Sequence, residues 1–335
     1  MLEEKDRLAD IAELIRDHIS ISDIDQYCAE TDIRKDDFIE IEPRDFIGQI
    51  FAVDGSNIRV CDWSVASLNK ICAGYAVYRG REWQRTVITY DDIFLADREN
   101  YASQFEHDLK SSFGLKDIAL KETDLDRLTT YFREFQEYIA LKDAISTAHT
   151  GDIILYDGSF DIYEPLRSIL EGIIREANGK AIDLLGISKS SAISWGEGVS
   201  RPFVQHTSHA GSIFLPGMPW YISLKDKNVK PLPNWDGMTY IVMFDGRSGR
   251  SFRVDAPAYL TDHIDSTLGA LIAHSCSAEC LGYPHSLFRA HRDIRIRHQE
   301  GSLLKMELMD MLSEMGLSDS QIRILMQDYH EVMEI

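Results

Sequence analysis

The chain has 335 residues, of which 44% are hydrophobic and 10% aromatic, and its formal net charge is −20. This size and composition are typical of a globular protein with a substantial core, in one large domain or two ordinary ones. No stretch approaches the roughly 18 to 20 uninterrupted apolar residues of a membrane span. The N-terminal sequence MLEEKDRLADIAELIRDHI is charged and amphipathic, unlike a signal peptide, so we expect a cytoplasmic protein without membrane contact.

The excess of acidic residues restricts how this chain could bind nucleic acid. Proteins that bind nucleic acid are expected to carry a basic field that attracts phosphates. This chain instead has 35 Lys and Arg residues against 55 Asp and Glu residues. Any nucleic-acid binding must therefore use a local groove, a partner protein or metal ions.

The five cysteines are odd in number and scattered along the chain. This pattern indicates reduced thiols rather than a disulfide framework. Cys276 and Cys280 would share one face of a helix, but no second pair of ligands accompanies them. A zinc site is therefore not expected.

The first half of the chain predicts a helix, three strands and a second long helix, in that order. Helices are recognised by apolar residues at steps of three and four, and strands by runs of β-branched and aromatic residues between turn residues. The elements are a helix within residues 1–30, a strand at 47–57, two strands joined by a turn at Arg79–Arg81, and a helix at 121–148.

The second half predicts strands and helices around an irregular middle. The elements are a strand from Gly151 into a second Asp-Gly-Ser triplet, a helix near 163–177, the strand AIDLLGIS, an irregular segment at 190–235, the strand-like run TYIVMFDG, and a helix near 261–281. Two short helices close the chain, divided at Gly316 and restarted by the capping-box pair Ser318 and Gln321.

An Asp-Gly-Ser triplet follows an apolar run at two places about a hundred residues apart. AVDGS contains Asp54 and LYDGS contains Asp157. A carboxylate at the end of a buried strand is unfavourable unless a ligand such as a divalent cation offsets its desolvation. Gly then permits a sharp turn, and Ser offers a hydroxyl and an amide. One such triplet is best explained as a simple exit from a strand, but two after matching strands favour a shared metal site.

The order of these features favours an α/β protein with a ribonuclease-H-like mixed sheet core and flanking helices. It comprises an acid on the first strand, an antiparallel hairpin, a helix with acids, an acid on a later strand, and a late helical acid or histidine. Such folds gather carboxylates around one or two divalent ions, which orient an attacking water and stabilise the leaving oxygen of a phosphodiester. Oxygen ligands suit Mg²⁺ or Mn²⁺, and a histidine favours Mn²⁺.

The chain also resembles a known family from about residue 45 to about residue 297. AVDGS, LYDGS, the Glu-bearing helix just before the second triplet, GISKSS and GYPHSLFRAHRDIRI together resemble the NurA nucleases, partners of the HerA hexameric ATPase. The resemblance implies a ribonuclease-H or PIWI-like core and manganese-dependent cleavage of DNA with 5′-to-3′ exonuclease activity, and endonuclease activity is compatible with it. It further implies a homodimer that works with the ATPase in DNA end resection and double-strand-break repair.

The resemblance assigns catalytic residues and divides the chain into three parts. Asp54 and Asp157 match the aspartates of the two triplets, His291 the histidine of the late Ala-His, and Tyr283 the tyrosine before proline. We expect Asp54, Asp157 and His291 to bind the metal ion, with Tyr283 in the catalytic site. The expected parts are an N-terminal helical segment at 1–45, a nuclease domain at 46–300 and a C-terminal helical extension at 301–335.

The helical metal ligand has two candidates. Glu137 lies twenty positions before Asp157, nearest to where the family places its acid. Glu134 shares a helical line with apolar residues, and a carboxylate on such a line needs a partner such as a metal ion. We expect Glu137 to be the ligand and keep Glu134 as the alternative.

The basic residues near the end of the resemblance are the expected DNA contacts. By resemblance, Lys189 in GISKSS faces the substrate, although a lone lysine after a strand is usually only solvated. The densest basic cluster comprises Arg289, Arg292, Arg295 and Arg297. These arginines are natural phosphate contacts, but a surface strand with alternating charge explains them equally well. His206 and His209 have no supporting acid, so we expect ordinary core or surface histidines.

Two other classes of function compete with the nuclease. The protein could be a non-catalytic scaffold for DNA processing that docks a partner ATPase. It could also be an actin-like or sugar-kinase ATPase, but the duplicated Gly-rich phosphate loops of that class are not found. The apolar face of the N-terminal helix is expected to serve the dimer or the ATPase, whereas the C-terminal helices are expected to pack on the protein's own core.

Overall fold

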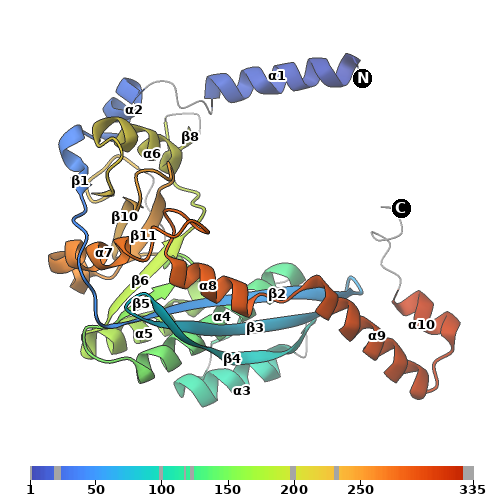
Figure 1. The fold of residues 1–335 in the computed structure, drawn as a ribbon. Coiled ribbons are helices and arrows are strands. Elements are labelled where there is room, and N and C mark those ends of the chain that lie inside the picture. Colours follow the sequence, from blue (N-terminus) through green and yellow to red (C-terminus); the bar gives the residue numbers. More distant parts are fainter. Residues whose placement is uncertain are drawn as a thin grey trace.

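The computed structural model describes residues 2–18, 24–97, 101–116, 118–120, 124–196, 201–229 and 234–326. Within these ranges one large sheet forms the centre of the molecule, with helices on both faces (Figure 1). Its strands are β1 (Ile39–Glu40), β2 (Gln49–Asp62), β3 (Ala66–Arg79), β4 (Glu82–Asp97), β5 (Ile153–Tyr156), β6 (Asp183–Ser188), β9 (Trp220–Ser223), β10 (Met238–Met243) and β11 (Phe252–Ala256). A separate small ribbon pairs β7 (Ser194–Trp195) with β8 (Arg201–Pro202).

The helices fill most of the remaining described chain. They are α1 (Leu2–His18), α2 (Ile24–Thr31), α3 (Tyr101–Phe113), α4 (Leu125–Thr147), α5 (Arg167–Gly179), α6 (Phe203–Phe214), α7 (Ile264–Ile272), α8 (His285–Ile294), α9 (His298–Glu314) and α10 (Asp319–Leu325). Short 3₁₀ turns at Lys35–Asp37, Glu164–Leu166 and Ala258–His263 lead into β1, α5 and α7.

The sheet is mixed, with the strand order β1-β9-β10-β11-β6-β5-β2-β3-β4. β2, β3 and β4 form an antiparallel meander, and β5 pairs with the other edge of β2 in parallel. β6 continues the parallel part, and β11 then pairs with it in the antiparallel sense. The expected α/β class, with a ribonuclease-H-like mixed sheet core and flanking helices, is confirmed by this arrangement.

The alternation of side chains along β2 sends successive residues to two different cores. Phe51 and Val53 belong to the core under α3, α4 and α5. Ile50 and Ala52 belong to the core under α7 and α8 on the opposite face. Because successive strand side chains point to opposite faces, Asp54 lies on the α8 face, and the next position lies on the α4 face.

The N-terminal part of the body packs on the same sheet. β1 pairs with β9 at the edge of the sheet. Tyr27 of α2 is buried in a third cluster with Trp195 and Phe203, which lies under α2 and α6. Residues from α2 onward therefore share a core with the remainder of the chain.

The two terminal helical regions differ in how far their apolar residues are covered. α1 and α9–α10 extend from different ends of the molecule (Figure 1). Leu8, Ile11 and Ile15 of α1 are 60%, 49% and 48% exposed, so the described apolar face of α1 has little cover. Leu304 and Leu308 of α9 instead pack in a small cluster with the ends of β2 and β3 and with α10. In the described part of the chain, no helix combines the length and apolarity needed to cross a membrane.

Four sequence-based expectations about elements were wrong. β2 does not end at the first triplet, because β3 remains paired with it through Asp54–Gly74, Gly55–Ala73 and Ser56–Cys72. The expected irregular middle contains α6 and β9. The helix expected to end near 281 ends at Ile272, since hydrogen bonds from Gly282 and His285 back to Ser275 and His274 close a loop there. The explanation of the late arginines as a surface strand fails because this segment forms α8.

The aromatic stack between β4 and α4 provides a test of the main core. Phe132 is fully buried, and its ring stacks on Phe94 with centroids 4.1 Å apart. We expect Phe132→Ala to lower the free energy of unfolding by about 3–5 kcal/mol, because it leaves a cavity. Ile47→Ala, at a position 89% exposed, should change it by less than about 0.5 kcal/mol. Urea unfolding followed by circular dichroism measures both, and equal stabilities of the two variants would contradict this account of the core.

Candidate metal centre

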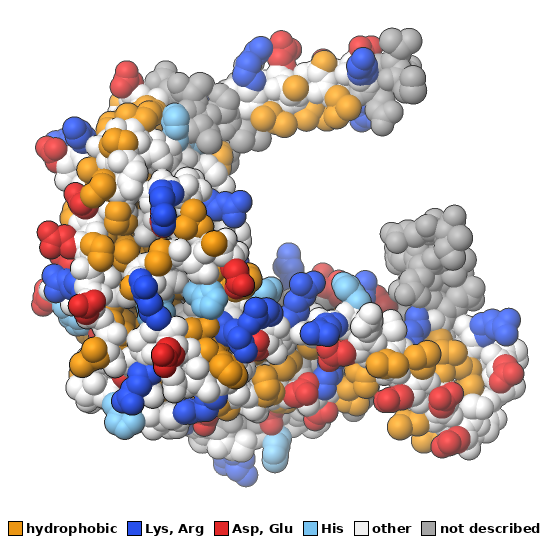
Figure 2. Space-filling view, in the orientation of Figure 1, with side chains coloured by type: hydrophobic (Ala, Val, Ile, Leu, Met, Phe, Trp, Pro, Cys, Tyr) orange, Lys and Arg blue, Asp and Glu red, His pale blue; other side chains and the backbone are white. Residues whose placement is uncertain are grey.

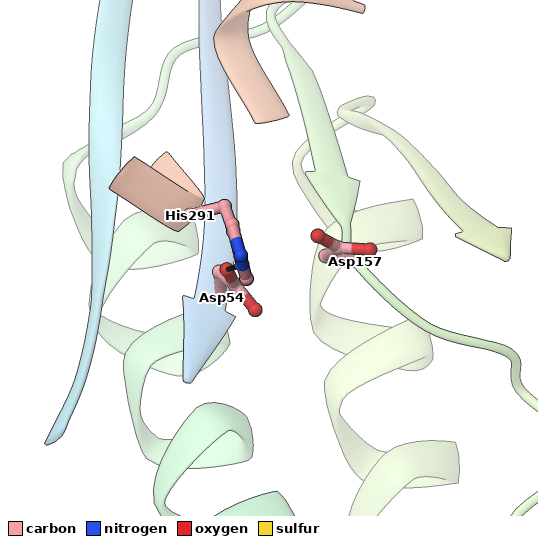
Figure 3. A group of neighbouring side chains, drawn as sticks. All are labelled: Asp54, Asp157 and His291. Atoms are coloured by element: carbon pink, nitrogen blue, oxygen red, sulfur yellow. Dashed lines mark hydrogen bonds and ion pairs between the residues drawn. The ribbon is translucent and has the colours of Figure 1, made fainter. Parts of the chain in front are cut away.

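Three side chains from distant parts of the sequence meet at one end of the β2–β5 pair. Asp54 comes from within β2, Asp157 directly follows β5, and His291 lies on α8 (Figure 3). Each offers one ligand atom, and these atoms all lie within 4.8 Å of one another. The structure therefore brings together three of the four residues that we expected to bind the metal ion, without Glu137 or its alternative Glu134.

Asp54 is held by two contacts. Its side chain is 7% exposed, and its Oδ1 accepts a hydrogen bond of 2.8 Å from the backbone N–H of Gly55. Its Oδ2 lies 2.9 Å from Nδ1 of His291. This imidazole is therefore within direct reach of the carboxylate, as the sequence analysis required.

Asp157 is held by the strand before it and by a lysine. Its backbone N–H donates to the carbonyl of Val53, which extends the β2–β5 pairing by one residue. The ammonium of Lys189 lies 2.6 Å from its Oδ2. Burial raises the pKa of Asp157, and the negative charge of Asp54 raises it further, whereas Lys189 and the Tyr283 hydroxyl lower it. The two carboxylates thus repel each other in a site that favours an added cation.

Tyr283 lies beside Asp157 in the same site. Its side chain is 7% exposed, and its pKa is raised mainly by burial and then by the charge of Asp157. Its hydroxyl has no hydrogen bond of good geometry within the described residues. The ring lies 5.2 Å from the ammonium of Lys189. The hydroxyl is thus directed toward Asp157.

A buried ion pair supports the loop that follows Asp157. Asp255 of β11 is fully buried, and its carboxylate accepts a 2.9 Å hydrogen bond from the backbone N–H of Phe160. Arg253 and Thr239 bind the same carboxylate. A buried carboxylate needs such partners because its desolvation is otherwise uncompensated. This network fixes the path of the chain immediately after the second triplet.

α8 places His291 at the edge of the core. Leu287, Ala290 and Ile294 bury one face of the helix against the sheet, with spacings of three and four residues. The backbone N–H of Ile296 also donates to the Ser56 hydroxyl at 3.1 Å. The first triplet thus contributes both a candidate ligand and a contact that anchors the end of α8.

Glu137 lies on the opposite side of β2 from Asp54. It is fully buried on α4, where its carboxylate binds Arg133 and accepts a 2.9 Å hydrogen bond from the Tyr156 hydroxyl. Burial raises the pKa of Glu137 to about 8, although the Arg133 guanidinium opposes this shift. Within the described residues, the group of three candidate ligands contains neither Glu137 nor Glu134.

Two of the predicted arginines on α8 lie beside the same acid, Asp293. Arg289 binds Asp293 at 2.6 Å and stacks on the ring of Trp83 at 4.3 Å. Arg292 is about half exposed and lies 3.8 Å from the same Asp293. Arg295 and Arg297 lie in the short link between α8 and α9.

His206 lies in the core, and two residues that support the site were not predicted from the sequence. His206 is buried and packs on Tyr27 and Trp195, as expected of a core histidine. Sequence reasoning missed Trp83 and Arg133. The spacing of Arg133 four residues before Glu137 was a detectable signal for a helical ion pair, whereas nothing in the sequence linked Trp83 with α8.

The donor set of the three residues fits a divalent cation. Two carboxylates supply hard oxygen ligands, and an imidazole supplies a nitrogen that Mn²⁺ accepts more readily than Mg²⁺. The ligand atoms already converge, and a cation would relieve the repulsion between Asp54 and Asp157. These side chains form a group able to hold such an ion.

Comparisons with known proteins identify the fold. No family model matches the chain, and no curated protein matches it by sequence. The structure matches the crystal structure of the NurA nuclease from Sulfolobus solfataricus, with a TM-score of 0.57 and 15% identity, over 95% of this chain and 97% of that chain. The chain has the fold of the NurA nucleases.

Two further NurA structures match this fold over almost their whole length. One crystal structure of NurA matches with a TM-score of 0.57 and 11% identity, over 96% of this chain and 99% of that chain. A crystal structure of NurA bound to dAMP and manganese matches with a TM-score of 0.54 and 11% identity, over 97% and 98% of the two chains. The NurA resemblance expected from the sequence motifs is confirmed at the level of the fold.

The contact between Gly55 and Glu137 provides a test of the site's packing. A Cβ at Gly55 would lie 2.8 Å from Cγ and 2.9 Å from Cδ of Glu137, too close for atoms in a packed interior. We expect Gly55→Ala to destabilise the protein by about 1–3 kcal/mol. Gly172→Ala on α5, where a Cβ meets no atom within 4 Å, should stabilise it by roughly 0.5–1 kcal/mol. Thermal unfolding measures both, and a Gly55→Ala variant as stable as the unsubstituted protein would show that Glu137 is not held there.

Proposed function

We propose that the protein is a metal-dependent nuclease that hydrolyses phosphodiester bonds in DNA. The observation that carries this proposal is the convergence of Asp54, Asp157 and His291 at one end of the β2–β5 pair. The NurA fold of the chain supports it. The negative net charge of the chain does not exclude this reaction, because hydrolysis requires only a local site.

Asp54, Asp157 and His291 would hold the metal ion in this proposal. A divalent ion bound there would orient a water molecule and stabilise charge on the leaving oxygen. The ammonium of Lys189 would offset the charge of the scissile phosphate beside Asp157, and the buried hydroxyl of Tyr283 would donate a hydrogen bond to it. We also propose that Arg289 and Arg292 contact neighbouring phosphates from α8.

We keep Glu137 as the proposed third acidic residue and fourth metal ligand of the site, with Glu134 as the alternative. Glu137 is buried directly behind Gly55, and its high pKa reflects a position that disfavours a free negative charge. A divalent cation at Asp54 would attract this carboxylate and lower its pKa. As long as Glu137 is bound to Arg133, its role is to support β2 from behind.

The finer parts of the proposal follow the family resemblance. We propose Mn²⁺ as the cofactor, with Mg²⁺ as a substitute, which the imidazole ligand and the manganese bound in one NurA structure support. We further propose 5′-to-3′ exonuclease activity, with endonuclease activity also compatible, on DNA in the cytoplasm. The protein would act as a homodimer with a HerA-type hexameric ATPase in DNA end resection and double-strand-break repair.

We also propose the division of the chain that the resemblance implies. Residues 46–300 would form the nuclease domain, with a helical segment at 1–45 before it and a helical extension at 301–335 after it. The uncovered apolar face of α1 supports a role of the first segment in assembly. The buried Tyr27 of α2 and the pairing of β1 with β9 support the inclusion of the end of that segment in the body.

Removal of either aspartate tests the proposed activity. We expect Asp54→Ala and Asp157→Ala each to lower cleavage by more than about 100-fold, because the loss of a ligand should cost at least as much as the loss of its supporting partners. Asp262→Ala, at an exposed position on the 3₁₀ turn before α7, removes the same charge and should leave activity unchanged. The measurement is degradation of 5′- and 3′-labelled linear DNA and of circular DNA, with Mn²⁺, with Mg²⁺ and with a chelator.

The stability of the aspartate variants distinguishes loss of chemistry from loss of fold. Both should unfold at temperatures equal to or above that of the unsubstituted protein, because removing one carboxylate relieves its repulsion of the other. Near-normal cleavage by either variant would refute the assignment. No cleavage of DNA by the unsubstituted protein with any divalent ion would favour the non-catalytic scaffold.

The exposed face of α1 generates a test of the proposed ATPase partner. We expect deletion of residues 1–20, or replacement of Leu8, Ile11 and Ile15 by Gln, to lower ATPase-stimulated digestion several-fold while basal manganese-dependent cleavage is retained. The reason is that apolar residues exposed on α1 would be buried in the complex. The matched control replaces two other exposed apolar residues by Gln. These are Met311 of α9 and Met315, the C-cap residue of α9. Full stimulation of the truncated protein would show that α1 is not the docking element.

A further inference from the structure

A groove lies next to the candidate metal centre on the side of Lys189 and Tyr283. Its volume is about 970 Å³, and it lies between the chain after β6, α6, the loop joining β10 to β11, and residues 279–288. Lys189 and Tyr283 line it while also contacting or facing Asp157. A ligand in this groove could therefore continue into the metal centre without leaving the protein surface.

The lining of the groove is locally balanced in charge, whereas the chain as a whole is acidic. Its charged lining residues are Lys189, Arg247, Arg250, Arg253 and Glu279. Asp157, Asp245 and Asp255 pair with three of these cations, whereas the whole chain has 35 basic residues against 55 acidic ones. On the face drawn in Figure 2, Lys and Arg side chains gather over α8 and the neighbouring loops, whereas acidic side chains are prominent on the outer rim and the C-terminal helices. A polyanion therefore meets less repulsion in the groove than the net charge of the chain would suggest.

The arginines of the groove differ in their exposure and in whether an acidic residue pairs with them. Arg253 is buried and paired with Asp255, so its main role is to stabilise the fold. Arg247 is held at the rim by Asp245 through contacts of 2.9 and 2.6 Å, but 68% of its side chain is exposed. Arg250 is exposed, and no side-chain partner of it is found in the described part of the chain. Arg250 is thus the cation best placed to bind a ligand.

Short hydroxyl side chains complete the lining. Seven of its 21 residues are serines. Ser208 and Ser251 face each other with their hydroxyl oxygens 2.6 Å apart, and the Ser188 hydroxyl is buried without a hydrogen-bond partner among the described residues. Hydroxyls and backbone amides bind phosphate and sugar oxygens in nucleic-acid complexes and carry no sequence information themselves. Ser212 and Ser248 donate to backbone carbonyls of the protein, so the Ser188 hydroxyl is a donor that this lining leaves for a strand backbone.

We propose that this groove binds the sugar-phosphate backbone of a single DNA strand on one side of the scissile phosphate. The inference rests on the proposed nuclease function and deepens it by naming where the strand leaves the metal centre. The volume of the groove falls in the range of sites for drug-sized ligands, roughly 300–1,000 Å³. This volume suits a short stretch of single strand and not a duplex. The strand passes from Asp157 along Lys189 and Tyr283 toward Arg250.

The test compares Arg250 variants of the full chain in strand binding. Fluorescence anisotropy with a labelled single-stranded oligonucleotide is measured in a chelator, so that the strand is bound and not cut, over a series of salt concentrations. We expect Arg250→Ala to raise Kd about fivefold and to flatten the slope of log K against log salt by about 0.7, the value for one phosphate contact on a single strand. Arg250→Lys, which keeps the charge, should retain the slope.

A matched control and a competitor make the outcome specific. Arg175→Ala on the exposed side of α5 lowers the net charge equally and should change neither Kd nor slope. In the same series with Mn²⁺, Arg250→Ala should raise KM for single-stranded DNA while kcat stays unchanged. Excess dAMP should not displace the oligonucleotide from the unsubstituted protein. Complete displacement by dAMP would overturn the proposal in favour of a nucleotide site.

The failure of this inference is distinguishable from failure of the nuclease proposal. If the unsubstituted protein binds and cuts DNA but Arg250→Ala leaves Kd, slope and KM unchanged, the groove proposal is overturned and the nuclease stands. If the unsubstituted protein binds the strand through Arg250 but cuts no DNA with any divalent ion, the groove stands as a binding site and the nuclease is refuted. Binding that changes equally in the Arg175→Ala and Arg250→Ala variants would show an effect of net charge alone and would also overturn the groove.

Discussion

The parallel pairing of β2 with β5 is the interaction on which the candidate site depends. It aligns Val53 with Tyr156, and the next backbone hydrogen bond, from Asp157 to Val53, sets the position of the second triplet. The two aspartates therefore lie side by side on neighbouring strands. A shift of one residue in this pairing would turn Asp54 or Asp157 to the other face of the sheet, and α8 could no longer bring His291 to both.

Some charged residues of this structure stabilise the fold through ion pairs, and others are positioned to bind a cation. Glu137 pairs with Arg133, and Asp255 pairs with Arg253, so these ion pairs support β2 and the loop after β5. Asp54 and Asp157 lie between these two supports, with His291 and Lys189 as their charged or polar neighbours. The acids that a cation could stabilise are thus rigidly placed, because their neighbours are satisfied by other partners.

The overall charge and the local charge of this protein have different consequences. A net charge of −20 repels DNA at long range, whereas screening limits that field to roughly 8–10 Å at physiological salt. In the groove beside the candidate metal centre, acids lie next to the cations and balance them, so short-range contacts can act where the long-range field does not.

The sequence by itself indicated the α/β class, the long helix before the second triplet, and Asp54 and Asp157 as candidate ligands, whereas His291 was assigned by the resemblance to the NurA nucleases. Those features are local. The helical periodicity of apolar residues predicts α4, and apolar runs followed by acids indicate strands that lead to a common edge. The tertiary structure alone decided that β2 continues through Asp54, because pairing with β3 overrides the turn propensity of Gly and Ser. It also decided that Glu137 lies behind Gly55, on the opposite face of β2 from Asp54, and that the loops beside α6 form a groove next to the candidate metal centre. These outcomes depend on contacts between segments far apart in the chain, which no local pattern records.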